Sequence, residues 1–544
     1  MPVQQSDFFE VIIIGAGQTG MYELIKMREI GASVKVIESG GDVGGAWYWN
    51  RYPGCRLDSE CYSYGYSFSK EVLDEWSWSE LFTKQEENLR YYNFVADKYD
   101  LRRDIQFNTT VTKAAYDEEH NLWRVTLDDG SALTCRFLLA ATGPLSAVQM
   151  PNIPGIDDFK GDSWHTAHWP QDPNGFGGQP YDFRGKKVGV IGTGSTGVQV
   201  IQETSKTAKE LFVFQRSGNW CAPLGNKPLS REEMEEIRAS YPDIFAKCKA
   251  TAASFIHDAI DKSVFEATEE EREAFFEKVY WQSGFGIWFG TYNDVLSDRE
   301  ANKILTDFVA RKIRQRVKDP VTAEKLIPKD HGFGIRRVPL ETNYYECYNQ
   351  DNVHLVDLKE TPVERITANG IKTIAKEYDL DVIIYATGFD AITGALKRID
   401  IRGIGGQSLK EKWSQGPLTY LGAQTVGFPN FFTLVGPHSG ASFCNIPRCI
   451  EDIVEWVSDF IDFARKQDVS YIEPLPESEK QWTQQIYEDS KDSLFAEVDS
   501  WFTGKNYNDP DAVKTFLLYL GGGPQYRQLL ADIKSDNYSG FVLR

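Results

Sequence analysis

Two stretches of this chain carry glycines at the spacing that lets a backbone turn approach a phosphate group. The first, at 15–20, reads Gly-Ala-Gly-Gln-Thr-Gly, and the second, at 192–197, reads Gly-Thr-Gly-Ser-Thr-Gly. Each follows a short apolar run and precedes a helix-like pattern. The first glycine of such a motif makes a tight turn, the second admits a pyrophosphate and the third lets helix and strand pack closely. Free N–H groups at the helix start favour phosphate, so both stretches predict dinucleotide sites.

The residues that would meet the adenosine end differ between the two stretches. Glu38 stands 18 residues beyond Gly20, close to the ~20 expected of a carboxylate that holds ribose hydroxyls. This site therefore suits FAD or NAD. In the second stretch, the apolar run 211–214 is followed by Gln215, Arg216 and Ser217. Arginine can pair bidentately with a 2′-phosphate, which predicts NADPH there. One site of each kind predicts a flavoprotein reduced by NADPH.

Paired glycines among large aromatic residues follow the first unit. Gly44 and Gly45 precede Trp47 and Trp49, a combination that favours backbone pressed against a flat ring with aromatic walls. A loop capped by surface aromatics is the alternative. A flavin disulfide reductase would need two cysteines that can bond, usually spaced C-x₄-C beside the flavin. Cys55 and the next cysteine, at 61, are spaced C-x₅-C, which on a helix points the side chains apart, and no second Cys or His cluster suggests a metal site.

Composition limits the classes of protein to which the chain can belong. Its 544 residues, 41% hydrophobic and 25% charged, predict two or three globular domains. The net charge of −20 argues against nucleic acid and anionic membranes as partners. No apolar run approaches the ~20 residues of a membrane span, and residues 1–7 lack the features of a secretory signal. Eight cysteines over this length indicate no disulfide framework, so we expect a soluble, cytosolic protein.

The remaining patterns supply the elements that position these motifs. Two near copies of an apolar run ending Ala-Thr-Gly, at 137–143 and 382–388, predict strands that cross between two nucleotide-binding units. The alternating runs 105–111 and 122–127 predict further strands. Residues 219–330 break this α/β rhythm and predict a helical insertion, with a capped helix starting at Ser230. The fold class is therefore α/β.

The segment between the first crossing and the second glycine turn carries the most specific signal. It fits F-x-G-x-x-x-H-x-x-x-W-P at every fixed position, namely Phe159, Gly161, His165, Trp169 and Pro170. This motif resembles the fingerprint of the Baeyer–Villiger monooxygenases, and the resemblance extends from Val11 to Leu543. In that family the fingerprint histidine is thought to couple domain movement to catalysis. From the residues alone, His165 would be a core or loop histidine.

The resemblance implies two doubly wound, Rossmann-like dinucleotide-binding domains, each discontinuous in sequence. The expected boundaries are an FAD-binding domain at 1–144 and 389–544, a linker at 145–151, an NADPH-binding domain at 152–218 and 331–388, and a helical insertion at 219–330.

The resemblance also implies roles for particular residues. Arg337 maps onto the catalytic arginine, which Asp58 would hold in place, and Arg336 stands where a lysine usually contacts the NADPH phosphate. The change keeps the charge but alters the hydrogen-bond geometry. Asn445 would lie at the flavin edge. The expected cofactor-binding residues are Gly15, Gly17, Gly20, Glu38, Gly45, Ala46, Trp47, Arg56, Asp58, Tyr64, Val111, Thr193, Gly194, Ser195, Thr196, Gly197, Arg216, Ser217, Arg336, Arg337, Ile446 and, as a lid over the nicotinamide, Trp501.

The activity that the resemblance implies is a monooxygenation with O₂ and a small-molecule ketone. NADPH reduces FAD, O₂ forms a C4a-peroxyflavin, and this species inserts oxygen beside the ketone carbonyl to give an ester or lactone. Segments such as 219–225 and 326–330 resemble the branch that contains cyclopentadecanone and camphor-pathway monooxygenases, which implies bulky or cyclic ketones. The alternatives are a flavin monooxygenase that oxygenates nitrogen or sulfur, and a non-enzymatic dinucleotide-binding redox sensor. The aromatic loop and the Arg336–Arg337 pair argue against the sensor.

Overall fold

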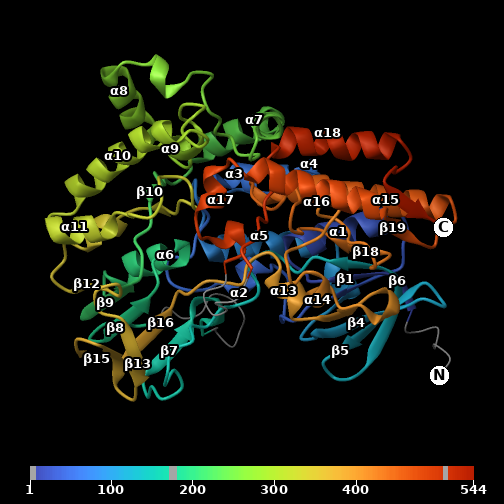
Figure 1. The fold of residues 1–544 in the computed structure, drawn as a ribbon, viewed down its shortest axis with the longest axis horizontal. Coiled ribbons are helices and arrows are strands. Elements are labelled where there is room, and N and C mark those ends of the chain that lie inside the picture. The colour runs from blue at the N-terminus through green and yellow to red at the C-terminus, as the bar shows by residue number, and fades with distance from the viewer. Residues whose placement is uncertain (1–7, 171–180, 506–512) are drawn as a thin grey trace.

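The computed structural model describes residues 8–170, 181–505 and 513–544. Two sheets lie side by side, each with helices against it, and a group of helices extends from the second sheet (Figure 1). The first seven residues, on which the expectation about a secretory signal rests, lie outside the described ranges. Among the described helices, none combines the length and the apolar character that crossing a bilayer requires.

The first sheet has a parallel part that continues into an antiparallel meander. Its order is β17-β4-β5-β6-β1-β2-β3, and β18 pairs in parallel with β6. The strands are β1 (Phe8–Ile14), β2 (Val34–Ile37), β3 (Ile105–Gln106), β4 (Val111–Asp117), β5 (Leu122–Leu127), β6 (Ala132–Ala140), β17 (Asp400–Arg402) and β18 (Phe431–Thr433). The predicted strand 122–127 is confirmed as β5. The predicted single strand 105–111 is wrong: only 105–106, in β3, and residue 111, where β4 begins, are strand, because the chain turns between them at Asn108, whose φ is +51°.

Strand β1 shows why an unbroken apolar run suits the centre of this sheet. Val11 and Ile13 are fully buried on one face, against α1 (Gln18–Glu29) and α15 (Ile446–Lys466). Ile12 and Ile14 point to the other face, where they pack in the core that contains Trp123 of the meander. A parallel strand covered on both faces needs apolar side chains at every position. The helices α5 (Gln85–Lys98) and α16 (Pro476–Ser490) lie in the same half of the molecule (Figure 1).

The second sheet is entirely parallel and repeats the plan of the first at smaller size. Its order is β12-β9-β8-β16-β7. The strands are β7 (Asp162–His165), β8 (Lys187–Ile191), β9 (Glu210–Gln215), β12 (Val353–Asp357) and β16 (Val382–Tyr385). The helix α6 (Ser195–Thr204) follows β8, and a small antiparallel sheet packs on the opposite face, formed by β13 (Val363–Thr367), β14 (Gly370–Thr373) and β15 (Glu377–Asp379). The α/β architecture with two nucleotide-binding units is therefore confirmed.

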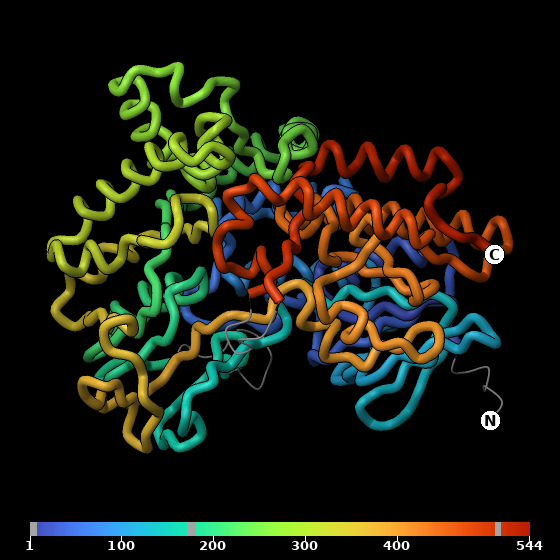
Figure 2. Tube along the Cα trace, viewed as in Figure 1, coloured from blue at the N-terminus to red at the C-terminus, as the bar shows by residue number. Residues whose placement is uncertain are grey.

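The segment expected to be a helical insertion is helical. It contains α7 (Arg231–Ala250), α8 (Glu269–Tyr280), α9 (Gly286–Phe289), α10 (Arg299–Arg316) and α11 (Pro320–Leu326). The cap predicted at Ser230 is a complete capping box with Glu233. Figure 2 shows this yellow-green segment next to the red C-terminal part of the chain. The two parts are joined where Gly523, in α18 (Gly522–Ser535), donates its N–H to Ala252 O.

Candidate active site

Both glycine motifs form the predicted strand–turn–helix, and the first glycine of each packs against a neighbouring strand end in the same way. Gly15 has φ +104°, and a Cβ there would stand 2.6 Å from Ala141 O. Gly192 has φ +107°, and a Cβ there would collide with Ala386 O. Each glycine thus lies against the strand end that carries an Ala-Thr-Gly copy. Such values of φ favour glycine, so the duplicated motif corresponds to a duplicated structure.

The helices that follow the two turns are open at their N-terminal ends. α1 and α6 have Gly17 and Gly194 as N-caps, no side chain caps either helix, and neither first turn contains an acidic residue. The first N–H groups of a helix lack partners within the helix and attract anions. These uncapped starts fit the pyrophosphates of two dinucleotides. Because the two starts are alike, they do not distinguish which dinucleotide each turn would hold.

The residues at the adenosine ends follow β2 and β9. Glu38 directly follows β2 and is buried; its Oε2 accepts a hydrogen bond from Ala16 N at 2.7 Å and its Oε1 accepts one from Gly40 N at 2.6 Å. The carboxylate therefore braces the glycine turn, and its remaining lone pairs are available to ribose hydroxyls. Arg216 and Ser217 follow β9 at the corresponding place, where Thr193 Oγ1 donates to Ser217 O at 2.8 Å. The acid-versus-arginine contrast is thus preserved in space.

The aromatic loop after β2 packs against the first glycine turn. Gly45 has φ +52°, and a Cβ there would stand 2.7 Å from Gly17 Cα. The short helix α2 (Ala46–Trp49) follows, and Trp47 Nε1 donates to Tyr64 OH at 3.2 Å. Val111, the first residue of β4, is buried. Gly45 therefore allows two backbone segments to touch, whereas the sequence predicted contact between the glycine pair and a flat ring.

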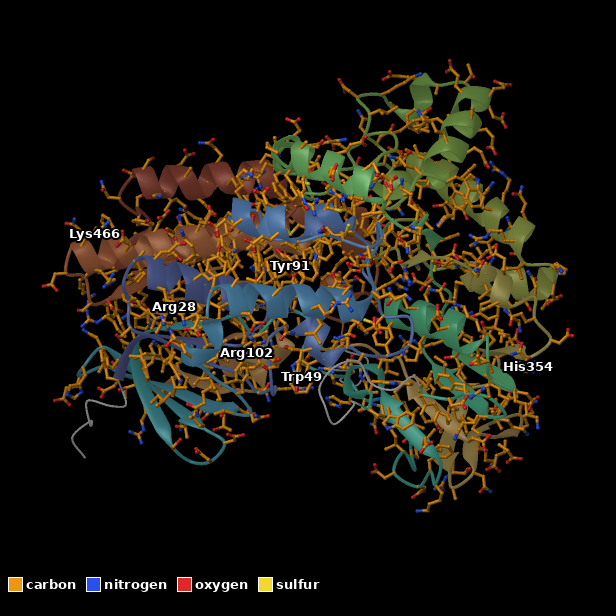
Figure 3. All side chains as sticks on the ribbon, turned by 180° about the vertical axis from the view of Figure 1, so that it is seen from behind. Arg28, Trp49, Tyr91, Arg102, His354 and Lys466 are labelled. Carbon is orange, nitrogen blue, oxygen red and sulfur yellow. A yellow bond between two sulfur atoms is a disulfide. The ribbon has the colours of Figure 1, made fainter. Side chains whose placement is uncertain are left out.

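This loop also contacts the second nucleotide-binding unit. Tyr52 OH donates to Gln199 Oε1 of α6 at 2.7 Å, and Gln199 Nε2 donates to Arg56 O at 3.1 Å. Figure 3 shows Trp49 at the junction between the two halves of the molecule. A dinucleotide on α6 and a flavin on α1 would therefore approach each other across the loop 45–56.

Arg337 lies at this junction and is held from three sides. Its Nη2 donates to Asp58 Oδ2 at 2.6 Å, and its Nη1 donates to Val338 O at 2.7 Å. Its guanidinium carbon lies 4.8 Å from the ring centre of Phe285 and 5.4 Å from that of Trp288. Aromatic faces attract cations, and more strongly where water is excluded. The structure thus brings Arg337 and Asp58 together as expected. It also places the guanidinium against two rings of the helical insertion, Phe285 and Trp288, which we call the aromatic seat of Arg337.

Arg336 points to a different partner. Its Nη2 donates to Asp330 Oδ2 at 3.2 Å, and its Nε is buried with no hydrogen-bond partner among the described residues. A hydrogen bond from His331 and the charge of Arg336 hold the pKa of Asp330 well below its usual range, although burial acts in the opposite direction. Arg337 therefore pairs with Asp58, and Arg336 pairs with Asp330. The Nε of Arg336 remains a donor that a phosphate could use.

The fingerprint histidine lies at the end of an edge strand. His165 ends β7, beside Tyr385 of β16, and its ring centre is 5.8 Å from that of Phe389. Burial, together with the nearby His168, lowers the pKa of His165 to about 4, so the ring is neutral. Trp169 packs against Trp164. Phe159 lies over Gly161, and Pro170 is the last residue described before 181. His165 is thus placed beside the crossing strand and away from Arg337.

The segments expected to form the flavin edge and the lid approach the junction from the C-terminal half. Asn445 Nδ2 donates to Ser63 Oγ at 3.1 Å, and Ile446 begins α15. Trp501 begins the 3₁₀ helix η5 (Trp501–Thr503), which packs on Phe443 through Phe502, with ring centres 5.0 Å apart. These residues therefore border the junction from a third direction.

Two pairs of cysteines are relevant to the alternative of a flavin disulfide reductase. Cys55 and Cys61 are buried and unbonded, and burial raises the pKa of Cys55 to about 12, which disfavours a reactive thiolate. Cys444 and Cys449, which the sequence analysis overlooked, have the C-x₄-C spacing and are joined by a disulfide. They stand at the N′ and N4 positions of α15, where side chains normally meet. The expectation that no disulfide framework exists therefore needs this one local exception.

Two features of the site went unrecognised in the sequence. The aromatic seat of Arg337 comes from the run 284–289, whose glycines and aromatics could have suggested a second ring-contacting loop. The Tyr52–Gln199 hydrogen bond spans 147 positions, and no local pattern predicts it.

Comparisons with known proteins place the chain in a family. Residues 9–272 match the model of flavin-binding monooxygenase-like proteins. The 2-oxo-Δ3-4,5,5-trimethylcyclopentenylacetyl-CoA monooxygenase of Pseudomonas putida is 52% identical over 99% of both chains. A Baeyer–Villiger monooxygenase of Pseudooceanicola batsensis is 41% identical over 98% of this chain and 96% of its own. A crystal structure of OTEMO complexed with FAD and NADP matches with a TM-score of 0.95, at 52% identity over 98% of this chain and 99% of that one.

Proposed function

The chain belongs to the Baeyer–Villiger monooxygenases, which depend on FAD and NADPH, and on that premise we propose that it converts bulky or cyclic ketones into esters or lactones. The family consumes O₂ and one organic substrate. The substrate range, the roles of individual residues and the domain boundaries given above are part of this proposal.

The observation that carries the proposal is the position of Arg337. A guanidinium fixed by Asp58, by the backbone and by two rings stands where the loop 45–56 meets the second nucleotide-binding unit. When bound, FAD reduced by NADPH supplies the activated oxygen that is inserted beside the carbonyl. Arg337 then offers a positive charge that needs no rearrangement to stabilise negative charge on the reacting oxygens. Asp58 orients this charge and need not transfer a proton.

The surroundings of Arg337 support an apolar substrate. Phe285, Trp288, Phe289 and Phe443 form a continuous set of ring contacts that starts at the guanidinium. Aromatic walls bury carbon-rich substrates and exclude water. The most similar relative named above acts, by its name, on a cyclopentenyl ketone attached to coenzyme A, so cyclic ketones with a bulky substituent are the first class to test.

A substrate panel tests this proposal. Purified enzyme with FAD, NADPH and O₂ is given cyclic ketones of increasing ring size, linear ketones, a thioether and a tertiary amine, and products are counted by mass spectrometry. We expect lactones from cyclic ketones, in proportion to NADPH consumed above the background rate. Oxygenation confined to sulfur or nitrogen would instead support the heteroatom alternative. NADPH consumption that no substrate stimulates would contradict both.

A further inference from the structure

A buried hydrogen-bonded pair, His257 and Glu60, joins the loop of Asp58 to the helical insertion. His257 Nε2 lies 2.7 Å from Glu60 Oε1, and the two side chains are only 4% and 2% exposed. Glu60 is the N-cap of α3 (Cys61–Tyr64), and His257 lies in the segment that follows α7, which contacts α3. The other carboxylate oxygen, Glu60 Oε2, is buried with no hydrogen-bond partner among the described residues. His257 is therefore the partner on which this carboxylate depends.

A third segment closes over the pair. Gly284 has φ +76°, and a Cβ there would stand 2.9 Å from His257 Nε2 and would collide with Glu60 Oε1. Backbone of the insertion therefore lies directly on both side chains. Because the contact leaves no room for a methyl group, the pair cannot move toward this backbone without displacing it.

Two of the three segments that meet here also hold Arg337. Asp58, two residues before Glu60, accepts the hydrogen bond of the guanidinium. Phe285, directly after Gly284, provides the nearer of its two rings. Trp288, in the same turn, donates from Nε1 to Gly334 O at 3.0 Å, on the loop that carries Arg337. Figure 1 shows α3 next to α7 and α9 at this point.

We propose that Glu60 and His257 are positioning residues, whose buried pair aligns the carboxylate of Asp58 with the aromatic seat of Phe285 and so fixes the guanidinium of Arg337. The inference rests on the proposed role of Arg337 in oxygen insertion. It predicts that loss of the pair damages oxygen insertion more than flavin reduction, because only insertion needs Arg337 at one exact place.

The test replaces His257 by residues of similar size. His257→Leu removes the hydrogen bond, and His257→Gln retains an amide that can still reach Glu60. Three quantities are measured in the holoenzyme: product formed per NADPH consumed, hydrogen peroxide released, and the anaerobic rate of flavin reduction by NADPH. We expect His257→Leu to lower the coupling, the amount of product per NADPH consumed, at least fivefold, while the rate of flavin reduction stays within twofold of wild type. His257→Gln should recover most of the coupling.

A matched control separates this effect from general destabilisation. Glu479 is a similarly buried carboxylate that pairs with Lys412 at 3.3 Å, in elements that do not touch Arg337. Glu479→Gln should lower the unfolding temperature without changing coupling. If His257→Leu does not fold, Glu60→Gln, which keeps the shape of the side chain, carries the same test.

A double-mutant cycle with Asp58 decides whether the pair acts through Arg337. Because both changes would displace the same guanidinium, His257→Leu should add less than twofold to the coupling loss of Asp58→Ala. Independent, multiplicative losses would overturn the inference. If Arg337→Lys loses coupling while His257→Leu and Glu60→Gln keep it, this inference fails and the proposed function stands. If Arg337→Ala keeps wild-type coupling, the role proposed for Arg337 itself fails.

Discussion

Replacing Arg337 should separate the two half-reactions of the enzyme. Its guanidinium is fixed before reaction by hydrogen bonds of 2.6 Å to Asp58 and 2.7 Å to Val338 O. Loss of one pre-positioned donor to a developing anion typically costs about 100- to 1,000-fold in rate, which is about 3–4 kcal/mol. Hydride transfer needs the nicotinamide in place and does not need that anion. Arg337→Ala should therefore still oxidise NADPH, while the rate of oxygen insertion falls about 100- to 1,000-fold and product per NADPH falls with it.

The assay measures ester or lactone and hydrogen peroxide in parallel, each per NADPH consumed. The electrons that no longer reach product should appear as peroxide. Arg337→Lys keeps the charge but loses the planar contact with Phe285 and the fixed donor geometry, so it should give intermediate coupling. Asp58→Ala should act in the same direction less completely, because it leaves the charge present. Wild-type coupling in Arg337→Ala would show that another group stabilises the reacting anion and that our assignment is wrong.

Three further predictions concern other parts of the site. Arg216→Ala should raise KM for NADPH about ten- to a hundredfold, since a charged hydrogen bond is worth ~1.5–3 kcal/mol, and should leave KM for NADH nearly unchanged; equal losses with both coenzymes would contradict the NADPH assignment. Glu38→Arg should purify with less bound flavin, because the carboxylate braces the first glycine turn; full flavin occupancy would mean that FAD binds elsewhere. Burial lowers the pKa of His165 to about 4, below the ~6.5 of an unfolded histidine. The folded state therefore loses stability as pH falls from ~6.5 toward 4, by up to about 3 kcal/mol from this residue. His165→Gln should flatten that part of the curve of unfolding free energy against pH; an unchanged curve would place the neutral state of His165 in doubt.

Much of the architecture could be predicted because its signals are local. Positive φ at Gly15 and Gly192 restricts both positions to glycine, so the sequence carries a direct mark of each turn. Ser230 and Glu233 close a capping box within one helical turn. The contrast between Glu38 and Arg216 follows from their place after a short strand. The disulfide of Cys444 and Cys449 is also local, since its C-x₄-C spacing bridges the start of α15.

The sequence by itself therefore determined the α/β class, the two glycine turns that begin the nucleotide-binding units and, through the fingerprint, the family. Only the tertiary structure decided what surrounds the reacting centre. Asp58 and Arg337 are 279 positions apart, and Glu60 and His257 are 197 apart. Contacts over such separations depend on how whole sheets and helices pack. They leave no periodic pattern or fixed spacing in the sequence from which they could be predicted. The aromatic seat of Arg337 and the buried pair of Glu60 and His257 form only where three segments that are distant in the sequence pack together.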